Sequence, residues 1–186
     1  MSNETLTDRV RELINDIRNG NKEALRELYA MTHKKVYFYL YRILNDKETA
    51  EDVLVDTFTA VWKSARNYEG RSQPQTWMFG IARNLAMNEL RKRKDHDDID
   101  DHPHLAGGNM PDAELSNRKK ILKNALSKVS PKHREILDLV FFHDMNYQEI
   151  SELLDIPVST VKTRVFYSKD ALKNTLLQMG VTKDVI

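Results

Sequence analysis

The stretch that decides the fold is YQEISELLDIPVSTVKTRVFYSK, residues 147–169. Its first eight residues have helical patterning, residues 155–157 form a tight turn, and a second helical run follows. A short helix, a turn and a second helix are the parts of a helix-turn-helix motif. Ser151 is small, as a helix crossing requires. The apolar residues expected to hold the two helices together are Ile150, Leu154, Ile156, Val161 and Val165.

The second helix of this motif is the candidate DNA-contacting element. Its first turn offers free backbone N–H groups, which suit a DNA phosphate. Lys162, Thr163 and Phe166 share one face and can reach base edges and thymine methyls in the major groove. Phosphate contacts are expected from the residues around this face: Ser159, Thr160, Arg164, Tyr167 and Lys169. The alternative is a helical hairpin with a solvated basic face.

The first half of the chain is also predicted to be helical, since it has no alternating strand pattern and its glycine and proline lie between the long segments. Asn21 is expected to cap one of its helices. The expected elements are a helix over 6–17, a long helix after Asn21, a third after Asn45-Asp46, a loop over 67–75 and a helix through 77–90.

The second half has clear helix boundaries before and after the motif. Ser130-Pro131 predicts a helix start with a capping hydroxyl and proline at the first helical position. Asn146, with Glu149 three residues on, predicts a capping box. The last helix is expected to end at Gly180.

Between the halves, the charges separate sharply. Arg91-Lys92-Arg93-Lys94 is followed by five aspartates within residues 95–101, although the net charge of the chain is only +1. Residues 95–111 are too polar, and too interrupted by glycine and proline, to pack. We therefore predict an all-α protein with two helical domains, 1–94 and 112–186, joined by a flexible acidic linker over 95–111.

Composition limits the environment and the chemistry of the chain. Of its 186 residues 40% are apolar, enough for packed cores, and none is cysteine, which excludes disulfides and thiolate metal sites. The N-terminus lacks the pattern of a secretory signal, and no apolar run approaches the roughly 20 residues of a spanning helix. We expect a cytoplasmic protein without membrane insertion.

A family resemblance rests on four blocks of sequence. The block SPKHREILDLVFFHDMNYQEISELLDIPVSTVKTRVFYSKDAL (130–172) resembles the C-terminal, promoter-reading domain of the extracytoplasmic-function (ECF) group of bacterial sigma-70 family sigma factors. Three other blocks of this sequence resemble, in order and spacing, the N-terminal domain of that group. They are ALRELYAMTHKKVYFYLYRIL (24–44), AEDVLVDTFTAVWK (50–63) and TWMFGIARNLAMNELRKRK (76–94).

The resemblance implies a transcription initiation factor that is not an enzyme and needs no cofactor. Its implied partners are promoter DNA, core RNA polymerase (through the flap and a coiled coil of the largest subunit) and an anti-sigma protein. The helix-turn-helix would read duplex DNA of the minus-35 element. Residues matching the coiled-coil contact are Glu51, Asp52, Asp56 and Phe58. Val55 departs from the polar residue common there.

The resemblance also implies residues for capture of the melted minus-10 strand. Ser64 and Tyr68 match positions that form a pocket for a flipped base, and Trp77, Phe79, Arg83 and Asn84 match the helix at the melting point. Arg91, Lys92 and Arg93 would supply charge to the backbone. Stacking on aromatic rings returns about 1–3 kcal/mol per base against an extrusion cost of a few kcal/mol. Trp77 is expected to be largely packed, so Tyr68, in a polar loop, is the better candidate for a base contact.

Two other interpretations remain open at this stage. One is a stand-alone helix-turn-helix regulator whose N-terminal half is a dimerisation or ligand domain, which would form a stable dimer and bind a palindrome. A helical hydrolase would need His96, His102 and His104, with neighbouring aspartates, to hold a metal, but their spacing matches no metal motif. We expect no metal site.

Overall fold

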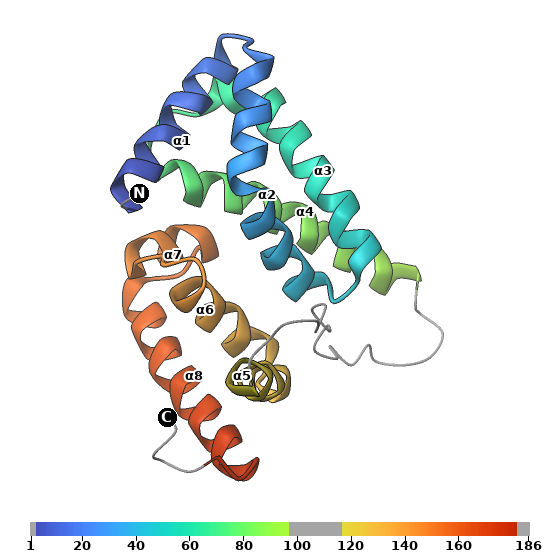
Figure 1. Ribbon diagram of the computed structural model, residues 1–186, viewed down its shortest axis with the longest axis vertical. Coiled ribbons are helices and arrows are strands. Elements are labelled where there is room, and N and C mark those ends of the chain that lie inside the picture. Colours follow the sequence, from blue (N-terminus) through green and yellow to red (C-terminus); the bar gives the residue numbers. More distant parts are fainter. Residues whose placement is uncertain (1–2, 97–116, 182–186) are drawn as a thin grey trace. The chain divides into compact units, whose positions relative to one another are not determined.

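Every regular element is a helix in the residues that the computed structural model describes, 3–96 and 117–181. They form two compact units, one with helices α1 to α4 and the other with α5 to α8 (Figure 1). The prediction of an all-α fold in two helical bodies is confirmed. Within these ranges no helix combines the length and the apolar character that a bilayer crossing requires.

The first unit is built around α2 (Lys22–Leu44), which contacts α1 (Asn3–Arg18), α3 (Lys47–Ser64) and α4 (Pro74–His96). In Figure 1 the blue α1 and the cyan α3 lie on either side of α2, and the green α4 crosses them. A short 3₁₀ turn, η1 (Ala65–Asn67), follows α3 directly. Three- and four-residue spacing puts the apolar side chains of each helix on its inner face. Fully buried members of this core include Val10, Leu13, Ile14, Leu28, Val36, Leu40, Met78 and Ala82.

Polar caps fix the helix boundaries of this unit. The side chain of Asn21 accepts hydrogen bonds from the backbone N–H groups of Glu23 (3.0 Å) and Ala24 (3.2 Å), as predicted. Asp46 caps α3 by accepting from the N–H of Thr49 at 2.8 Å. Between them Asn45 ends α2 in the left-handed conformation. These caps satisfy backbone donors that would otherwise lack partners at the helix starts.

The second unit has α5 (Asn117–Lys128), α6 (Pro131–Phe141), α7 (Tyr147–Leu154) and α8 (Val158–Gln178). The helix α8 contacts all of the other three. The capping box at Asn146 and Glu149 is confirmed, since both reciprocal bonds are present. The expectation that the hydroxyl of Ser130 caps α6 is wrong, because this side chain makes no cap bond. The helix starts instead with Pro131, and the N–H of Arg134 donates to the Ser130 carbonyl at 2.9 Å.

The turn between α7 and α8 is held by a reciprocal pair of bonds. The hydroxyl of Ser151 donates to the carbonyl of Ile156 at 2.6 Å, and the N–H of Ile156 donates back to the carbonyl of Ser151 at 3.1 Å. Asp155 takes the left-handed conformation that ends α7, with φ 52°. Ser151 thus does more than leave room for a helix crossing, because it also closes the turn.

The predicted domain boundaries meet the described residues only at their edges. Helix α4 continues to His96, two residues beyond the predicted end of the first domain. Residues 97–116, which include most of the predicted linker and the start of the second domain, lie outside the described residues. The linker therefore stays a prediction.

Candidate nucleic-acid interfaces

The outer face of α8 carries the expected base-reading residues. Lys162 and Thr163 are exposed, and Phe166 is 69% exposed, which is unusual for an aromatic side chain. The opposite face of the same helix is buried and consists of Val161, Val165 and Ser168. Helical periodicity therefore separates the packing face from the solvent face, as the sequence predicted.

The start of α8 is open to a ligand. Pro157 precedes the first turn and no side chain caps it, so the first N–H groups of the helix face a site that favours anions. Ser159 is exposed and Thr160 is half-buried. The hydroxyl of Thr163 donates to the Ser159 carbonyl at 3.0 Å, and its oxygen and methyl remain available for a base edge.

Aromatic and basic side chains flank this face. Tyr167 is exposed and its ring lies 5.5 Å from that of Phe166. The ammonium of Lys169 lies 5.4 Å from the ring of Phe141, while Arg164 is half-buried. Phe141, the last residue of α6, and Phe142, its C-cap, are both exposed. The sequence did not predict this exposure, because the apolar spacing of that helix indicates core positions. The expected phosphate contacts thus border an aromatic surface.

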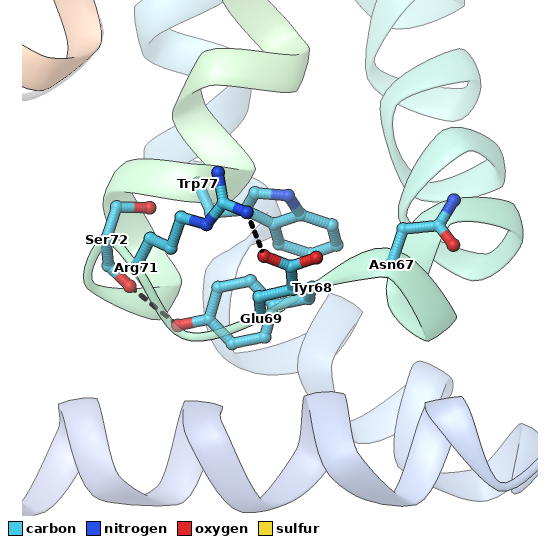
Figure 2. A pocket seen from close by; sticks show the side chains of 6 residues that line it. All are labelled: Asn67, Tyr68, Glu69, Arg71, Ser72 and Trp77. Atoms are coloured by element: carbon cyan, nitrogen blue, oxygen red, sulfur yellow. Dashed lines mark hydrogen bonds and ion pairs between the residues drawn. The ribbon is translucent and has the colours of Figure 1, made fainter.

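In the first unit, the loop between η1 and α4 forms a pocket of about 230 Å³ (Figure 2). Its aromatic walls are Tyr68 and Trp77, whose ring centroids lie 4.9 Å apart with the planes at 41°. Glu69 and Arg71 form an ion pair beside the rings. The full lining is Asn67, Tyr68, Glu69, Arg71, Ser72 and Trp77. Two aromatic walls with polar groups between them can stack and hydrogen-bond a planar heterocycle.

The burial of Tyr68 differs from what the sequence predicted. Tyr68 is only 8% exposed, and its hydroxyl donates to the carbonyl of Ser72 at 2.7 Å. Burial raises the pKa of Tyr68 above the ordinary value for a phenol. Trp77 is half-buried and is the more exposed of the two residues. The expectation of an accessible Tyr68 was wrong because the polar loop folds back against the start of α4, where the Tyr68 hydroxyl bonds Ser72 and its ring contacts Trp77.

Several other residues expected at the melted strand have different surroundings. Phe79 is 3% exposed and its ring packs 5.1 Å from that of Tyr39, so the expectation of a π-face offered to DNA is corrected to a core role. The hydroxyl of Ser64 donates to the Ala60 carbonyl at 2.6 Å, and the residue does not line the pocket. Asn84 is exposed and Arg83 half-buried on α4. Polar loop residues Asn67, Glu69, Arg71 and Ser72 take the place of Ser64 in the lining.

The basic end of α4 is partly tied to the protein. Arg91 and Lys92 are exposed and make local contacts, Arg91 to Asn88 (3.1 Å) and Lys92 to Glu89 (3.3 Å). The guanidinium of Arg93, in contrast, lies 3.4 Å from the Asp46 carboxylate and contacts the Thr49 hydroxyl. Arg93 therefore joins α4 to the start of α3 in this conformation.

The acidic face of α3 is exposed as expected for a docking surface. Glu51, Asp52 and Asp56 are exposed, and Val55 among them is 61% exposed. Phe58 is buried instead, so its expected direct contact with a partner is corrected. The ring of Tyr29 lies 4.9 Å from that of Phe58 and is itself exposed.

No cluster of potential metal ligands occurs among the residues that the structure describes. Of the three histidines considered for a metal, His102 and His104 lie outside those residues, and only the backbone of His96 is described.

The chain matches two family models. One is sigma-70 region 2, over residues 28–96, and the other is sigma-70 region 4, over residues 119–172. The ECF RNA polymerase sigma factor SigM of Bacillus subtilis is 30% identical over 163 residues, covering 85% of this chain and 98% of that protein. The ECF sigma factor SigW of the same organism is 26% identical over 183 residues, covering 90% and 96%.

Solved structures support the fold. The sigma factor RpoE in complex with the anti-sigma factor NepR from Bartonella quintana matches with a TM-score of 0.68 at 22% identity, covering 81% of this chain and 95% of that one. CnrH in complex with the cytosolic domain of CnrY matches with a TM-score of 0.65 at 19% identity, covering 91% and 97%. Because regions 2 and 4 both match in order and the chain is 30% identical to SigM, it belongs to the ECF group of sigma-70 family RNA polymerase sigma factors.

Proposed function

We propose that this sigma factor directs promoter-specific transcription initiation through two separate DNA sites and has no catalytic chemistry of its own. The observation that carries the proposal is the presence of two unlike surfaces on two units. One is a solvent-facing helix with an open N-terminus, and the other is an aromatic pocket in a loop. Because core RNA polymerase works in the bacterial cytoplasm, the protein acts there.

The helix α8 reads the minus-35 element as duplex DNA. Lys162, Thr163 and Phe166 enter the major groove, where a lysine can reach guanine and an aromatic side chain can contact a thymine methyl. The uncapped first turn, with Ser159 and Thr160, binds a phosphate and sets the orientation of the helix. Arg164, Tyr167 and Lys169 bind the flanking backbone.

The pocket at Tyr68 and Trp77 takes one base of the melted minus-10 strand. Trp77 provides the accessible ring, and Asn67, Glu69 and Arg71 provide donors and acceptors for the edge of the base. Stacking worth about 1–3 kcal/mol offsets much of the cost of extruding that base. Asn84, Arg83, Arg91 and Lys92 along α4 hold the strand on either side.

Two protein partners complete the proposal. The acidic face of α3, formed by Glu51, Asp52, Val55 and Asp56, docks on the coiled coil of the largest polymerase subunit, while the second unit meets the flap. An anti-sigma protein holds the factor inactive, as suggested by the complex of the sigma factor RpoE with the anti-sigma factor NepR. Residues 1–94 would then bind polymerase and the minus-10 element, 95–111 would link, and 112–186 would read the minus-35 element.

Promoter binding with and without core polymerase tests the proposal. In a gel-shift assay the pure protein should run as a monomer and bind promoter duplex weakly, and core polymerase should convert this to tight binding with permanganate-reactive thymines. A stable dimer that binds a palindrome tightly without polymerase would contradict the proposal and favour a stand-alone regulator.

A further inference from the structure

We infer that Arg11 of α1 is a positioning residue for the base pocket, holding the loop and the start of α4 in the shape that receives a flipped base. The inference rests on the proposed function of the pocket and adds to it a residue outside the matched region 2, which begins at residue 28. Arg11 does not line the pocket, so its effect passes through the residues that it binds.

The first link runs from Arg11 to the wall formed by Trp77. The Nη2 of Arg11 donates to the side-chain oxygen of Gln73 at 2.9 Å, across 62 residues of sequence. The backbone carbonyl of Gln73 accepts from the N–H of Trp77 at 3.0 Å. Gln73 therefore starts α4 with its backbone while its side chain is held by α1. A shift of Gln73 would move the Trp77 ring with it.

The second link runs from Arg11 to the wall formed by Tyr68. The positive charge of Arg11 opposes the rise that burial causes in the pKa of Tyr68. The same hydroxyl donates to the Ser72 carbonyl, as Figure 2 shows. One guanidinium therefore interacts with residues at both ends of the loop, Tyr68 and Gln73.

Helix α1 is packed into the core of the first unit and can hold these contacts in place. Val10, Leu13 and Ile14 are fully buried in the core of the unit. The loop itself contains Gly70 in the left-handed conformation (φ 73°), which glycine adopts without a steric penalty. A site on a loop gains precision from such a rigid neighbour.

Arg11 orders the loop before the base enters. Without Arg11, the loop loses conformational entropy when the base is captured, and this cost reduces the free energy gained by stacking. Contacts of a partly exposed arginine are modest, so we expect a two- to fivefold effect on base capture, on the order of that for exposed polar pairs. Docking of α3 on polymerase and duplex binding by α8 use other residues and should not change.

The experiment uses the full chain with core polymerase on a promoter selected with the wild-type protein. With 2-aminopurine placed at each minus-10 position in turn, its fluorescence reports the captured base. Arg11→Ala and Gln73→Ala should each reduce capture about two- to fivefold, and the double variant should lose no more than either alone. Arg11→Lys, which keeps the charge and one donor, should recover part of the loss.

Two matched controls lie on the same helix. Arg9→Ala removes the tie to α2, and Arg18→Ala removes an exposed charge from the last turn, without touching the loop. Both should leave capture within the error of the wild-type value, and every variant should keep the wild-type affinity for core polymerase. If Arg9→Ala lowers capture as much as Arg11→Ala, or if Arg11→Ala has no effect, Arg11 does not position the pocket.

A Trp77 variant tests the proposed base pocket independently of the positioning role of Arg11. Trp77→Ala should abolish the fluorescence signal whatever Arg11 does. If wild type and Trp77→Ala give the same signal, the pocket is not the base site. If they differ while Arg11→Ala equals wild type, only the positioning role is overturned.

Discussion

Among single side chains, the two helix starts of the second unit show how far residue type determines local structure. Asn146 and Ser130 both have side chains that favour the N-cap position. Only Asn146 makes the expected bonds, to the N–H groups of Gln148 (2.9 Å) and Glu149 (3.0 Å). At Ser130 the following proline lacks an N–H and already has a helical φ, so one donor fewer needs a partner. The same residue class therefore contributes differently at the two positions.

Replacing these caps should separate their contributions to stability. Asn146→Ala should lower the free energy of unfolding of the second unit by about 1 kcal/mol, because two backbone donors and the capping box lose their partner. Ser130→Ala should change it by less than roughly 0.5 kcal/mol. Urea unfolding followed by circular dichroism measures both. Equal losses at the two positions would contradict the cap geometry.

Asp46 links acid stability to the packing of α3 and α4. Bonds from the Thr49 side chain and backbone, and then the charge of Arg93, hold the pKa of Asp46 below its ordinary value of 3.8. A depressed folded-state pKa means that the carboxylate stabilises the fold above the unfolded value, and that this stability is lost as pH falls through the folded-state pKa. Asp46 therefore matters most as a charged group at neutral pH.

The variant Asp46→Asn keeps a capping oxygen but removes the titration. Its stability should be below that of wild type at pH 7 and should converge on wild type as the pH falls below about 3.8, the ordinary value. Thermal unfolding between pH 7 and pH 3 measures the difference. A constant difference over this range would show that the Asp46 charge does not contribute.

At the level of helices and loops, the sequence predicted regular segments well and the loop poorly. The inner and outer faces of α8 follow from helical spacing alone, which is a local property. The burial of Tyr68 depends on how the loop folds onto the start of α4, through the bond of its hydroxyl to Ser72 and its ring contact with Trp77. Phe58 and Phe79 match family positions for external contacts, but the burial of each ring depends on α2, through Tyr29 and Tyr39 respectively. Periodicity along one helix does not contain that information.

The outer face of α8 can be tested as an element that contacts DNA. With polymerase present, Lys162→Ala should weaken promoter binding and reduce the slope of log K against log salt by about 1, as for loss of one cation near the DNA. Lys173→Ala, also exposed on α8 but about 16 Å further along its axis, is the matched control and should leave the slope unchanged. Identical slopes for wild type and Lys162→Ala would place the DNA elsewhere.

In the molecule as a whole, the proposed DNA contacts are divided between the two units. Each unit has its own buried core, with Leu13, Leu28 and Met78 in one and Ile136, Leu139 and Ile150 in the other. A separate core allows a small domain to fold alone with modest stability. We therefore expect the proposed duplex-reading and base-capturing surfaces to be carried by units that fold independently of each other.

Separate expression of the two units tests this independence. The fragments 1–101 and 102–186 should each be helical by circular dichroism and unfold cooperatively. Fragment 102–186 should retain weak, salt-sensitive binding to minus-35 duplex, and fragment 1–101 should not bind it. An unfolded fragment, or duplex binding that requires both units, would contradict the division.

The most direct test of the account is to map the RNA 5′ ends made by core polymerase with this protein from a randomised DNA library. We expect transcripts whose templates share two sequence blocks at a fixed spacing. Thr163→Ala should relax the upstream block alone, and Glu69→Ala, in the lining of the pocket, the downstream block alone. Transcripts with no shared blocks, or one variant that alters both blocks equally, would contradict recognition by two independent surfaces.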